Sequence, residues 1–299
     1  MEEMNFRKPE LGDQELIRSY IVKGHTGGCE KTFTNVFLWA RFYQVTFAII
    51  EDTLVFRTEG ESGPEFSYPK GEPLCEKKAL DALMAYCEEN GFAFVLYHVY
   101  VEEFEQLEGW YPGQFQITYN RDYADYVYET EKLATLPGKK YHSKRNHINK
   151  FNLLYKDWTY ETLSDENVEE CFQMALKWRG INHVDDDEEK NAEMAFTMNS
   201  LRLFKELGLV GGLLRVNGEI AAFSVGEPIN AEIFNVHIEK AFVDIEGAYP
   251  VINQQFVLHE CMNYTYINRE EDVGEEGLRK AKLSYRPAYL IEKGVVTRR

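Results

Sequence analysis

The segment Asn268–Tyr285 reads NREEDVGEEGLRKAKLSY and lies between two apolar, strand-like runs. It combines charges of both signs with two glycines and a tyrosine, a mixture that a solvated surface helix does not need. We interpret Tyr264–Ile267 as a strand that ends in an acidic turn, and Gly274 and Gly277 as the start of a short basic helix. Polar side chains that converge at a strand end in an α/β layer commonly form a ligand site. The alternative is a capped surface helix stabilised by Glu–Lys pairs.

A second segment, Leu136–Phe151, reads LPGKKYHSKRNHINKF and carries five Lys or Arg, two His and no acid. The whole chain has a formal net charge of −17, so this segment is a place where an acidic protein can hold phosphate or another anion. Pro137 and the glycine after it predict a helix from about Pro137 to Phe151. The helical spacing puts Lys140, Lys144 and His147 on one face. The predicted inward anchors are Tyr141, Ile148 and Phe151. The alternative is a basic helix docked on an acidic part of the same chain.

The two segments together carry a resemblance to a known family. The pair LPGKKYHSKRNHINKF and NREEDVGEEGLRKAKLSYRP resembles bacterial proteins related to the C-terminal domain of phosphatidylglycerol lysyltransferase, the DUF2156 family, over about residues 5–293. The resemblance implies two tandem acetyltransferase-like (GNAT) domains, akin to aminoacyl-phosphatidylglycerol synthases and to Fem-type aminoacyltransferases that use aminoacyl-tRNA. The full lysyltransferase also has a multi-pass membrane domain, whereas no apolar run in this sequence approaches the roughly 20 residues that cross a bilayer.

Composition is that of a protein with two ordinary domains. The 299 residues are 44% hydrophobic and 14% aromatic, which is enough for two cores. The acidic start Met1–Asn5 lacks the apolar core of a signal peptide. The five widely spaced cysteines, Cys29, Cys75, Cys87, Cys171 and Cys261, form neither a disulfide framework nor a zinc pattern. The acidic run His183–Glu188 lacks EF-hand spacing. We therefore expect a cytoplasmic protein with reduced thiols and no metal site.

Hydrophobic periodicity predicts a similar order of elements in each half of the chain. In the first half we expect helices at about 10–22 and 77–90, strands at 45–50 and 53–58 joined across Glu51-Asp52, and a strand at 92–97. In the second half we expect helices at 165–180, 188–207, 248–263 and 274–283, and strands at 209–216, 219–226, 232–238, 264–267 and 288–293. The Asn217-Gly218 pair between two of these strands is the strongest hairpin signal in the chain.

This order predicts the fold class. Two helices, three antiparallel strands, helix, strand, helix, strand is the order expected of a GNAT domain. The prediction is therefore an α/β (α+β) protein of two tandem GNAT-like acyl-CoA N-acyltransferase domains, each a mixed, mostly antiparallel sheet flanked by helices. The predicted domains are residues 1–130 and 131–299.

The identity of an acyl donor depends on one turn. A GNAT domain that uses acyl-coenzyme A holds the pyrophosphate at a glycine-rich helix start after the third or fourth strand. Here the matching stretch is Val243–Pro250, in which only Gly247-Ala248 remains of the pattern, and Asp244 and Glu246 would repel a pyrophosphate. This departure favours a bulkier donor such as aminoacyl-tRNA, held in part by Lys139–Lys150. Because a charge of −17 opposes tRNA docking, both donors stay open and no cofactor is established.

The sequence therefore predicts an acyl- or aminoacyltransferase of the family it resembles. The activated donor would be aminoacyl-tRNA or acyl-CoA, and the acceptor an amine or hydroxyl of a small molecule or a lipid head group. The alternative, favoured by the reduced Gly247-Ala248 turn, is a non-catalytic GNAT-fold protein that binds an anion or another ligand. The predicted catalytic residues are Glu270, Asp272 and Tyr285. The predicted substrate-binding residues are Lys139, Lys140, Lys144, Arg145, Asn146, Asn235, His237, Asn268, Arg269, Arg279 and Lys282.

Two of these residues carry more specific expectations. His237, beside Asn235 in a predicted central strand, is open to two interpretations, a general base or a hydrogen-bonded core residue. Arg279 is expected to act as a bidentate fork for a carboxylate or phosphate, which a lysine could not replace. Leu278 and Leu283 are expected to hold the helix of Arg279 on the sheet.

Overall fold

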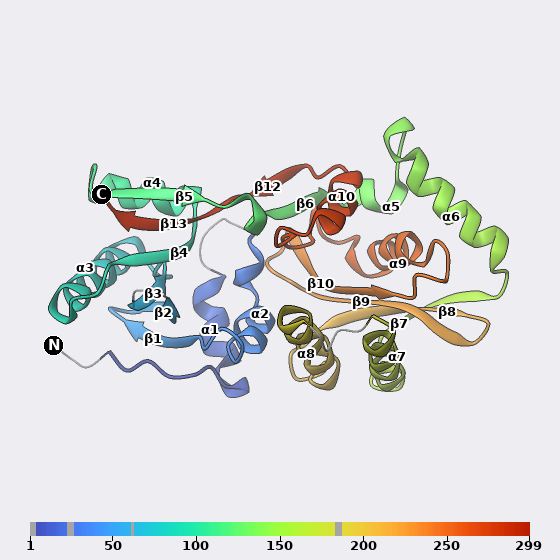
Figure 1. Cartoon of the computed structure of the whole chain (residues 1–299), viewed down its shortest axis with the longest axis horizontal. Helices are drawn as coiled ribbons and strands as arrows, with labels where there is room; N and C mark the ends of the chain where they lie inside the picture. The colour runs from blue at the N-terminus through green and yellow to red at the C-terminus, as the bar shows by residue number, and fades with distance from the viewer. Residues whose placement is uncertain (1–3, 23–26, 61–62, 183–186) are drawn as a thin grey trace. The chain divides into compact units, whose positions relative to one another are not determined.

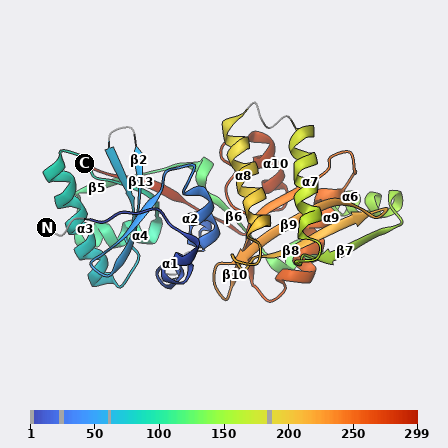
Figure 2. The ribbon, with the colours of Figure 1, turned by 90° about the horizontal axis from the view of Figure 1, so that it is seen from below.

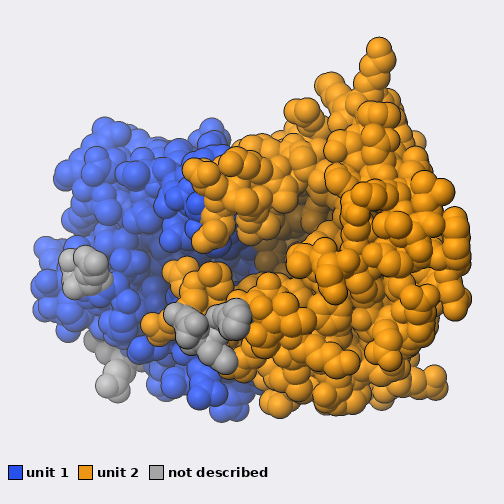
Figure 3. Space-filling model, turned by 45° about the vertical axis from the view of Figure 1, so that its right-hand side comes forward, with its two compact units in different colours: residues 1–125, 271–274, 291–299 blue, residues 126–270, 275–290 orange. Residues whose placement is uncertain are grey.

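The computed structural model describes residues 4–22, 27–60, 63–182 and 187–299 of the chain. The chain forms two compact units, which Figure 3 colours separately. Unit 1 comprises Met1–Asp125, Glu271–Gly274 and Ile291–Arg299, and unit 2 comprises Tyr126–Glu270 and Glu275–Leu290. Unit 1 therefore contains both ends of the sequence. In Figure 3 the surface of unit 2 is hollowed on the face shown.

Unit 1 is built on a six-stranded sheet with the order β1-β2-β3-β4-β13-β5 (Figure 1). Its strands are β1 (Thr46–Ile50), β2 (Thr53–Gly60), β3 (Gly63–Ser67), β4 (Val95–Tyr100), β5 (Phe115–Tyr119) and β13 (Lys293–Arg298). Its helices are α1 (Gln14–Ile21), α2 (Phe33–Trp39), α3 (Pro73–Asn90) and α4 (Val101–Trp110), with single 3₁₀ turns at Leu11–Asp13, Cys29–Lys31 and Arg121–Tyr123. Strands β1 to β3 are antiparallel, and α3 crosses over to β4, which is parallel to β3.

Local sequence explains the boundaries of α3 in unit 1. Pro73 occupies the first helical position, where a missing N–H costs nothing, and Gly91 ends the helix in the left-handed conformation with φ 70°. Leu80 and Leu83, three residues apart on one face, are fully buried against the sheet. The predicted hairpin between β1 and β2 forms although no glycine is present, with both Glu51 and Asp52 at positive φ.

Unit 2 is built on a seven-stranded sheet with the order β12-β6-β11-β10-β9-β8-β7. Its strands are β6 (Asp125–Glu129), β7 (Trp158–Thr162), β8 (Val210–Val216), β9 (Glu219–Pro228), β10 (Ile233–Ala241), β11 (Tyr266–Asn268) and β12 (Tyr289–Ile291). Its helices are α5 (Thr130–Thr135), α6 (His142–Leu154), α7 (Val168–Ile181), α8 (Glu188–Arg202), α9 (Ala248–Phe256) and α10 (Glu276–Ser284), with a 3₁₀ turn at Lys139–Tyr141 and a π-helical turn at Val257–Cys261. Helices α7 and α8 cover one face of the sheet and α9 covers the other (Figures 1 and 2).

Unit 2 shows the predicted order of a helix pair, three antiparallel strands, a helix and a strand. Unit 1 shows the same order, with α2 and β3 in addition to the predicted elements, and in both units the last of these strands is parallel to the third. The predicted fold class is therefore confirmed. The Asn217-Gly218 hairpin is also confirmed, since both residues have positive φ between β8 and β9.

The strands at the end of each half are exchanged. β6 follows β5 in sequence but pairs antiparallel with β11 in the sheet of unit 2. β13 follows β12 but inserts between β4 and β5 in the sheet of unit 1. The prediction of a single closing strand at 288–293 is therefore wrong. This part of the chain forms two strands, β12 and β13, which belong to different sheets. Their pairing partners are remote in sequence, so local periodicity could not separate them.

A β-bulge interrupts β10. Val236 pairs with Gly226 and Ile238 pairs with Val225, so His237 is the extra residue on its strand. Bulges re-aim side chains and often lie next to active sites. Gly226 is required opposite the bulge, because a Cβ atom there would collide with the carbonyl oxygen of Asn235.

We predict that Gly226→Ala lowers the free energy of unfolding by at least about 2 kcal/mol, because the clash is with backbone rather than with a flexible side chain. The matched control is Gly277→Ala in α10, where a Cβ atom meets nothing within 4 Å. That change should leave stability unchanged or raise it by up to about 1 kcal/mol, since alanine favours helix. Urea denaturation of both variants measures the difference, and equal stability would show that the bulge relaxes freely.

Candidate functional site

The candidate site lies where two parallel strands of unit 2 separate. β10 and β11 pair from Ile233↔Tyr266 to Asn235↔Asn268, after which β11 ends while β10 continues. Beyond the last pair, side chains bridge the opening. Nδ1 of His237 lies 2.9 Å from Oε1 of Glu270, and Nη2 of Arg269 lies 3.1 Å from Oε1 of Glu239. The ends of parallel strands are a common place for ligands in α/β sheets.

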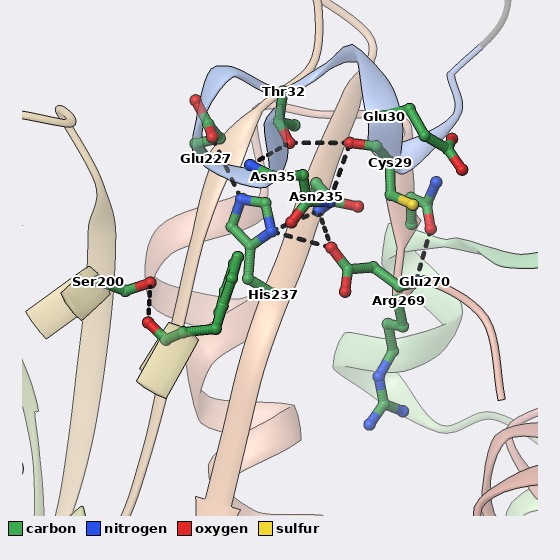
Figure 4. Close-up of polar contacts among 12 residues, drawn as sticks. Cys29, Glu30, Thr32, Asn35, Ser200, Glu227, Asn235, His237, Arg269 and Glu270 are labelled. Carbon is green, nitrogen blue, oxygen red and sulfur yellow. Dashed lines mark hydrogen bonds and ion pairs between the residues drawn. The ribbon is translucent and has the colours of Figure 1, made fainter. Parts of the chain in front are cut away.

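His237 is held between two carboxylates (Figure 4). Its side chain is fully buried, and its Nε2 lies 3.2 Å from Oε1 of Glu227, on the side away from Glu270. Burial alone would lower the pKa of His237, but hydrogen bonds and charge from Glu227 and Glu270 raise it to about 9. The imidazole is therefore protonated at neutral pH and donates to both acids. Of its two interpretations, the hydrogen-bonded residue fits this geometry better than the free base.

Glu270 is the member of this group that a ligand can reach, because 21% of its side chain is exposed. Asn235 Nδ2 donates to Oε1 of Glu270 over 2.7 Å. The backbone of Glu270 is left-handed, with φ 58°, and its N–H donates to Oδ1 of Asn268 over 2.7 Å. A non-glycine residue in this conformation is unusual and points to a turn fixed by its surroundings.

Lys282 of α10 fixes the same turn. Its buried ammonium donates to the carbonyl oxygens of Arg269, over 2.6 Å, and of Glu270, over 3.2 Å. Leu278 and Leu283 are 41% and 42% exposed, so the expectation that they hold this helix on the sheet is wrong. The helix is attached through a lysine that satisfies strand-end carbonyls, an interaction that hydrophobic periodicity does not reveal.

Two cations lie against one aromatic ring beside the turn. The guanidinium of Arg269 is 5.0 Å from the ring centre of Tyr285, and Nζ of Lys144 is 3.9 Å from the same point. Tyr285 is buried, and burial raises the pKa of its hydroxyl. Burial and the neighbouring charge of Arg269 lower the pKa of Lys144 to about 8.

The rest of the basic segment is placed differently. Its helix begins at His142, after the Lys139–Tyr141 turn, and the three inward anchors are confirmed: Tyr141 and Phe151 are buried and Ile148 packs on the core. Lys139 and Lys140 are exposed. Arg145 donates to the carbonyl oxygens of Leu136 and Gly138, and Asn146 lies 3.2 Å from the His142 ring nitrogen. Lys144 is the residue that the structure brings to Arg269 and Tyr285.

The start of α9, where a GNAT domain would hold a pyrophosphate, is covered by α6. Gly247 has φ 87°, and a Cβ atom there would lie 2.7 Å from the carbonyl oxygen of His147. The Tyr155 hydroxyl accepts from the backbone N–H of Glu246 over 3.2 Å, and Lys150 pairs with the Glu246 carboxylate at 2.7 Å. Gly247 thus allows α6 and α9 to approach each other closely. Side chains on and just after α6 contact Glu246, which would otherwise face a bound phosphate.

Asp272 and Arg279 follow Glu270 in the chain, in the turn before α10 and on α10 itself. Asp272 belongs to unit 1, is fully buried, and accepts from the N–H of Gly274 over 3.0 Å. Its other carboxylate oxygen lies 3.5 Å from Nη1 of Arg121. Arg279 is half-buried on α10. Most of the acidic run His183–Glu188 lies outside the described residues.

Unit 1 contains a buried polar cluster that the sequence did not reveal. The ammonium of Lys293 lies 2.7 Å from Asp125, 2.5 Å from Glu30 and 3.7 Å from Glu271, and it donates to Sγ of Cys29 over 3.5 Å. Burial raises the pKa of the Cys29 thiol well above its usual value. Ligand atoms of Cys29, Asp125 and Glu271 lie within 4.8 Å of one another, but the ammonium already supplies a positive charge among them. No motif marks these residues, because the strand exchange brings them together.

Across the described part of the chain, no helix has the length and apolar character that crossing a membrane requires.

Comparisons with known proteins agree with this architecture. Residues 23–296 match the model of a family described as phosphatidylglycerol lysyltransferase, C-terminal. A conserved protein of unknown function from Bacteroides thetaiotaomicron is 38% identical, with a TM-score of 0.91 over 99% of this chain and 100% of that one. The structure of L-PGS from Bacillus licheniformis is 14% identical, with a TM-score of 0.64 over 96% of this chain and 92% of that one, a likeness of fold alone.

A curated relative is more distant. An uncharacterized protein from Mycoplasmoides gallisepticum is 25% identical over 203 residues, which are 66% of this chain and 64% of that protein. This chain therefore spans just under two thirds of the length of that relative.

The His237 cluster predicts how stability depends on pH. The pKa of His237 is about 9 in the folded chain and near 6.5 in the unfolded one, so its stabilising contribution is complete below about pH 6.5 and is lost as pH rises through 9. We expect the free energy of unfolding to fall across this window by on the order of 3 kcal/mol more in the native protein than in His237→Gln. Denaturation at pH 6, 7.5 and 9.5 measures it. Parallel profiles for the two proteins would contradict the raised pKa.

Proposed function

The chain belongs to the phosphatidylglycerol lysyltransferase C-terminal family, and from this premise we propose that it is an acyltransferase acting on an amine or hydroxyl acceptor. The observation that carries the proposal is the Glu270 carboxylate. It is partly exposed, oriented by buried His237 and Asn235, and located where β10 and β11 separate. A fold of this kind hosts many activities, so the proposal rests on this site rather than on the architecture.

Glu270 is proposed as the catalytic residue. The acceptor's lone pair attacks the carbonyl carbon of the donor while Glu270 takes the acceptor's proton. The bond to the leaving oxygen or sulfur then breaks, and that atom receives the proton back from Glu270. His237, protonated and unexposed, acts as a positioning residue that keeps Glu270 ionised and directed toward the acceptor. Asn268 and Lys282 hold the backbone of the same turn.

The donor is proposed to be an aminoacyl ester, of which aminoacyl-tRNA is the example, rather than acyl-CoA. The support is the contact of α6 with Gly247 and Glu246, at the place in unit 2 where a coenzyme A pyrophosphate would be expected. A charge of −17 works against tRNA binding, so local cations such as those of the Lys139–Lys150 segment would have to offset it. The acceptor is proposed to be a small molecule or lipid head group with a free amine or hydroxyl.

The remaining predicted residues are also given roles as proposals, and Tyr285, which the sequence predicted to be catalytic, is here proposed to bind substrate. Arg269, Tyr285 and Lys144 are proposed to bind the donor or acceptor near the opening of the strands. Arg279, Lys139, Lys140, Arg145 and Asn146 are proposed to contact parts of a large donor that lie away from this opening, so a small anionic probe would not reach them. Asp272 remains a proposed catalytic residue, although its burial favours a role in shaping the acidic turn.

We predict that Glu270→Gln lowers the rate of transfer by about 10²- to 10⁴-fold, because glutamine keeps the hydrogen-bonding shape but cannot accept a proton. The matched control is Glu275→Gln, an exposed acid nearby in sequence with the same charge change, which should alter the rate less than about twofold. The assay follows a labelled group from aminoacyl-tRNA or acyl-CoA to a panel of amines and phospholipids.

Two results would overturn the proposal. Equal rates for Glu270→Gln and the native protein would remove Glu270 as the base. Native protein that binds a donor or acceptor in a thermal-shift screen, yet transfers nothing with either donor, would instead support the non-catalytic ligand-binding alternative.

A further inference from the structure

We propose that Lys144 and Arg269 form a subsite, on the ring of Tyr285, for one singly charged oxyanion of the phosphodiester or carboxylate kind. The subsite adds to the proposed function the charge of one substrate group. Only the statement that this group belongs to a substrate rests on the proposed function. The anion would complete a charge balance that the protein leaves open.

The charges around the ring do not cancel. Lys144 and Arg269 bring two positive charges to within about 5 Å of the centre of Tyr285. The neighbouring carboxylate is Glu239, which lies 3.1 Å from Nη2 of Arg269 and accepts a hydrogen bond from Asn253 over 2.9 Å. One carboxylate against two cations leaves one positive charge. A singly charged anion neutralises it, whereas a doubly charged one would leave an excess of negative charge.

Arg269 has a donor to offer. Its side chain is 11% exposed, and Nη1 is buried with no hydrogen-bond partner among the described residues. A buried, unpaired donor costs free energy, and the cost is larger when the group is charged. An oxyanion that accepts from Nη1 would recover this cost. The other nitrogen, Nη2, already donates to Glu239. The guanidinium would then donate from Nη2 to the protein's carboxylate and from Nη1 to an oxygen of the ligand.

Lys144 supplies the second contact. In the part of the chain that the structure describes, its ammonium faces the ring of Tyr285 and is paired with no carboxylate. A cation above an aromatic ring is stabilised less than a partly desolvated ammonium that is paired with a counter-ion. The pKa of Lys144, about 8, agrees with this lack of a counter-ion, because burial and the charge of Arg269 both disfavour the protonated ammonium. A bound anion would act in the opposite direction.

The neighbouring cations do not form this subsite. Arg145 is committed to the carbonyl oxygens of Leu136 and Gly138, and Lys139 and Lys140 are exposed to solvent. Charges of that kind attract anions weakly and lose the effect in salt. Lys140 therefore serves as a matched control, because it lies four residues from Lys144 in the same basic segment and carries the same charge.

The first test measures the pKa of Lys144 in the native protein. Lysines are labelled by reductive ¹³C-methylation, and the Lys144 resonance is assigned by its absence from Lys144→Met. Dimethyl phosphate or acetate is added at constant ionic strength. We expect either anion to raise the pKa of Lys144 from about 8 by roughly one unit or more. The resonance of Lys140 should not move. An unchanged pKa of Lys144 with both anions would overturn the proposal, and the variant is needed only to assign the resonance.

The second test measures the affinity for the same two probes by calorimetry or NMR titration. Lys144→Met should weaken binding by about tenfold or more, and Lys140→Met by less than about twofold. Tighter binding of dimethyl phosphate assigns the subsite to a phosphodiester, and tighter binding of acetate assigns it to a carboxylate. Equal losses in the two variants would show general attraction by surface charge and would refute the subsite.

Failure of the subsite can be told apart from failure of the proposed function. Glu270→Gln should keep the affinity for the preferred probe while it loses acyl transfer. If the native protein binds the probe through Lys144 but transfers no acyl group, the subsite stands and the enzyme proposal fails. If transfer depends on Glu270 but neither probe binds, the enzyme proposal stands and the subsite fails.

Discussion

The exchange of terminal strands is the constraint on which the rest of the structure depends. β13 pairs with β4 on one side and β5 on the other, and β6 pairs with β11. Without these insertions, β4 and β11 would each expose a row of unpaired backbone groups at a sheet edge, which proteins avoid. The exchange also delivers the ammonium of Lys293 to Asp125 and Glu30 in the interior of unit 1. Neither half of the sequence therefore completes its sheet from its own residues.

The candidate site is built from buried charged groups, each of which would lower the stability of the fold if its partner were removed. His237 is charged and buried, and it is tolerated there because Glu227 and Glu270 accept from both ring nitrogens. The bulge that makes His237 the extra residue of β10 depends on Gly226 in the facing strand. Lys282 in turn donates hydrogen bonds to two backbone carbonyl oxygens of the turn that presents Glu270. One partly exposed carboxylate is thus held by buried cations, so the protein fixes its position before any ligand binds.

The same scaffold illustrates why the fold does not decide the donor. Unit 2 retains the strand, turn and helix start at which related folds bind phosphate, yet α6 packs on Gly247 at that place. The positive charge lies instead near the opening of β10 and β11, where Lys144 and Arg269 share one aromatic ring. Which ligand a strand end can hold in such a fold therefore depends on which helix covers it, and so on segments outside the shared core.

The sequence by itself determined the helices and strands whose patterns are local, the Asn217-Gly218 hairpin, the inward anchors of α6 and the family. It also indicated Glu270, His237 and Asn235 as candidates, since polar residues at strand ends are visible in the pattern. Only the tertiary structure decided that residues 288–298 divide between two sheets, that Lys282 rather than Leu278 or Leu283 attaches α10, and that Lys293 meets Cys29, Glu30 and Asp125. The physical reason is range: periodicity reports which face of an element is buried, whereas strand pairing and buried ion pairs depend on partners that are distant in the chain.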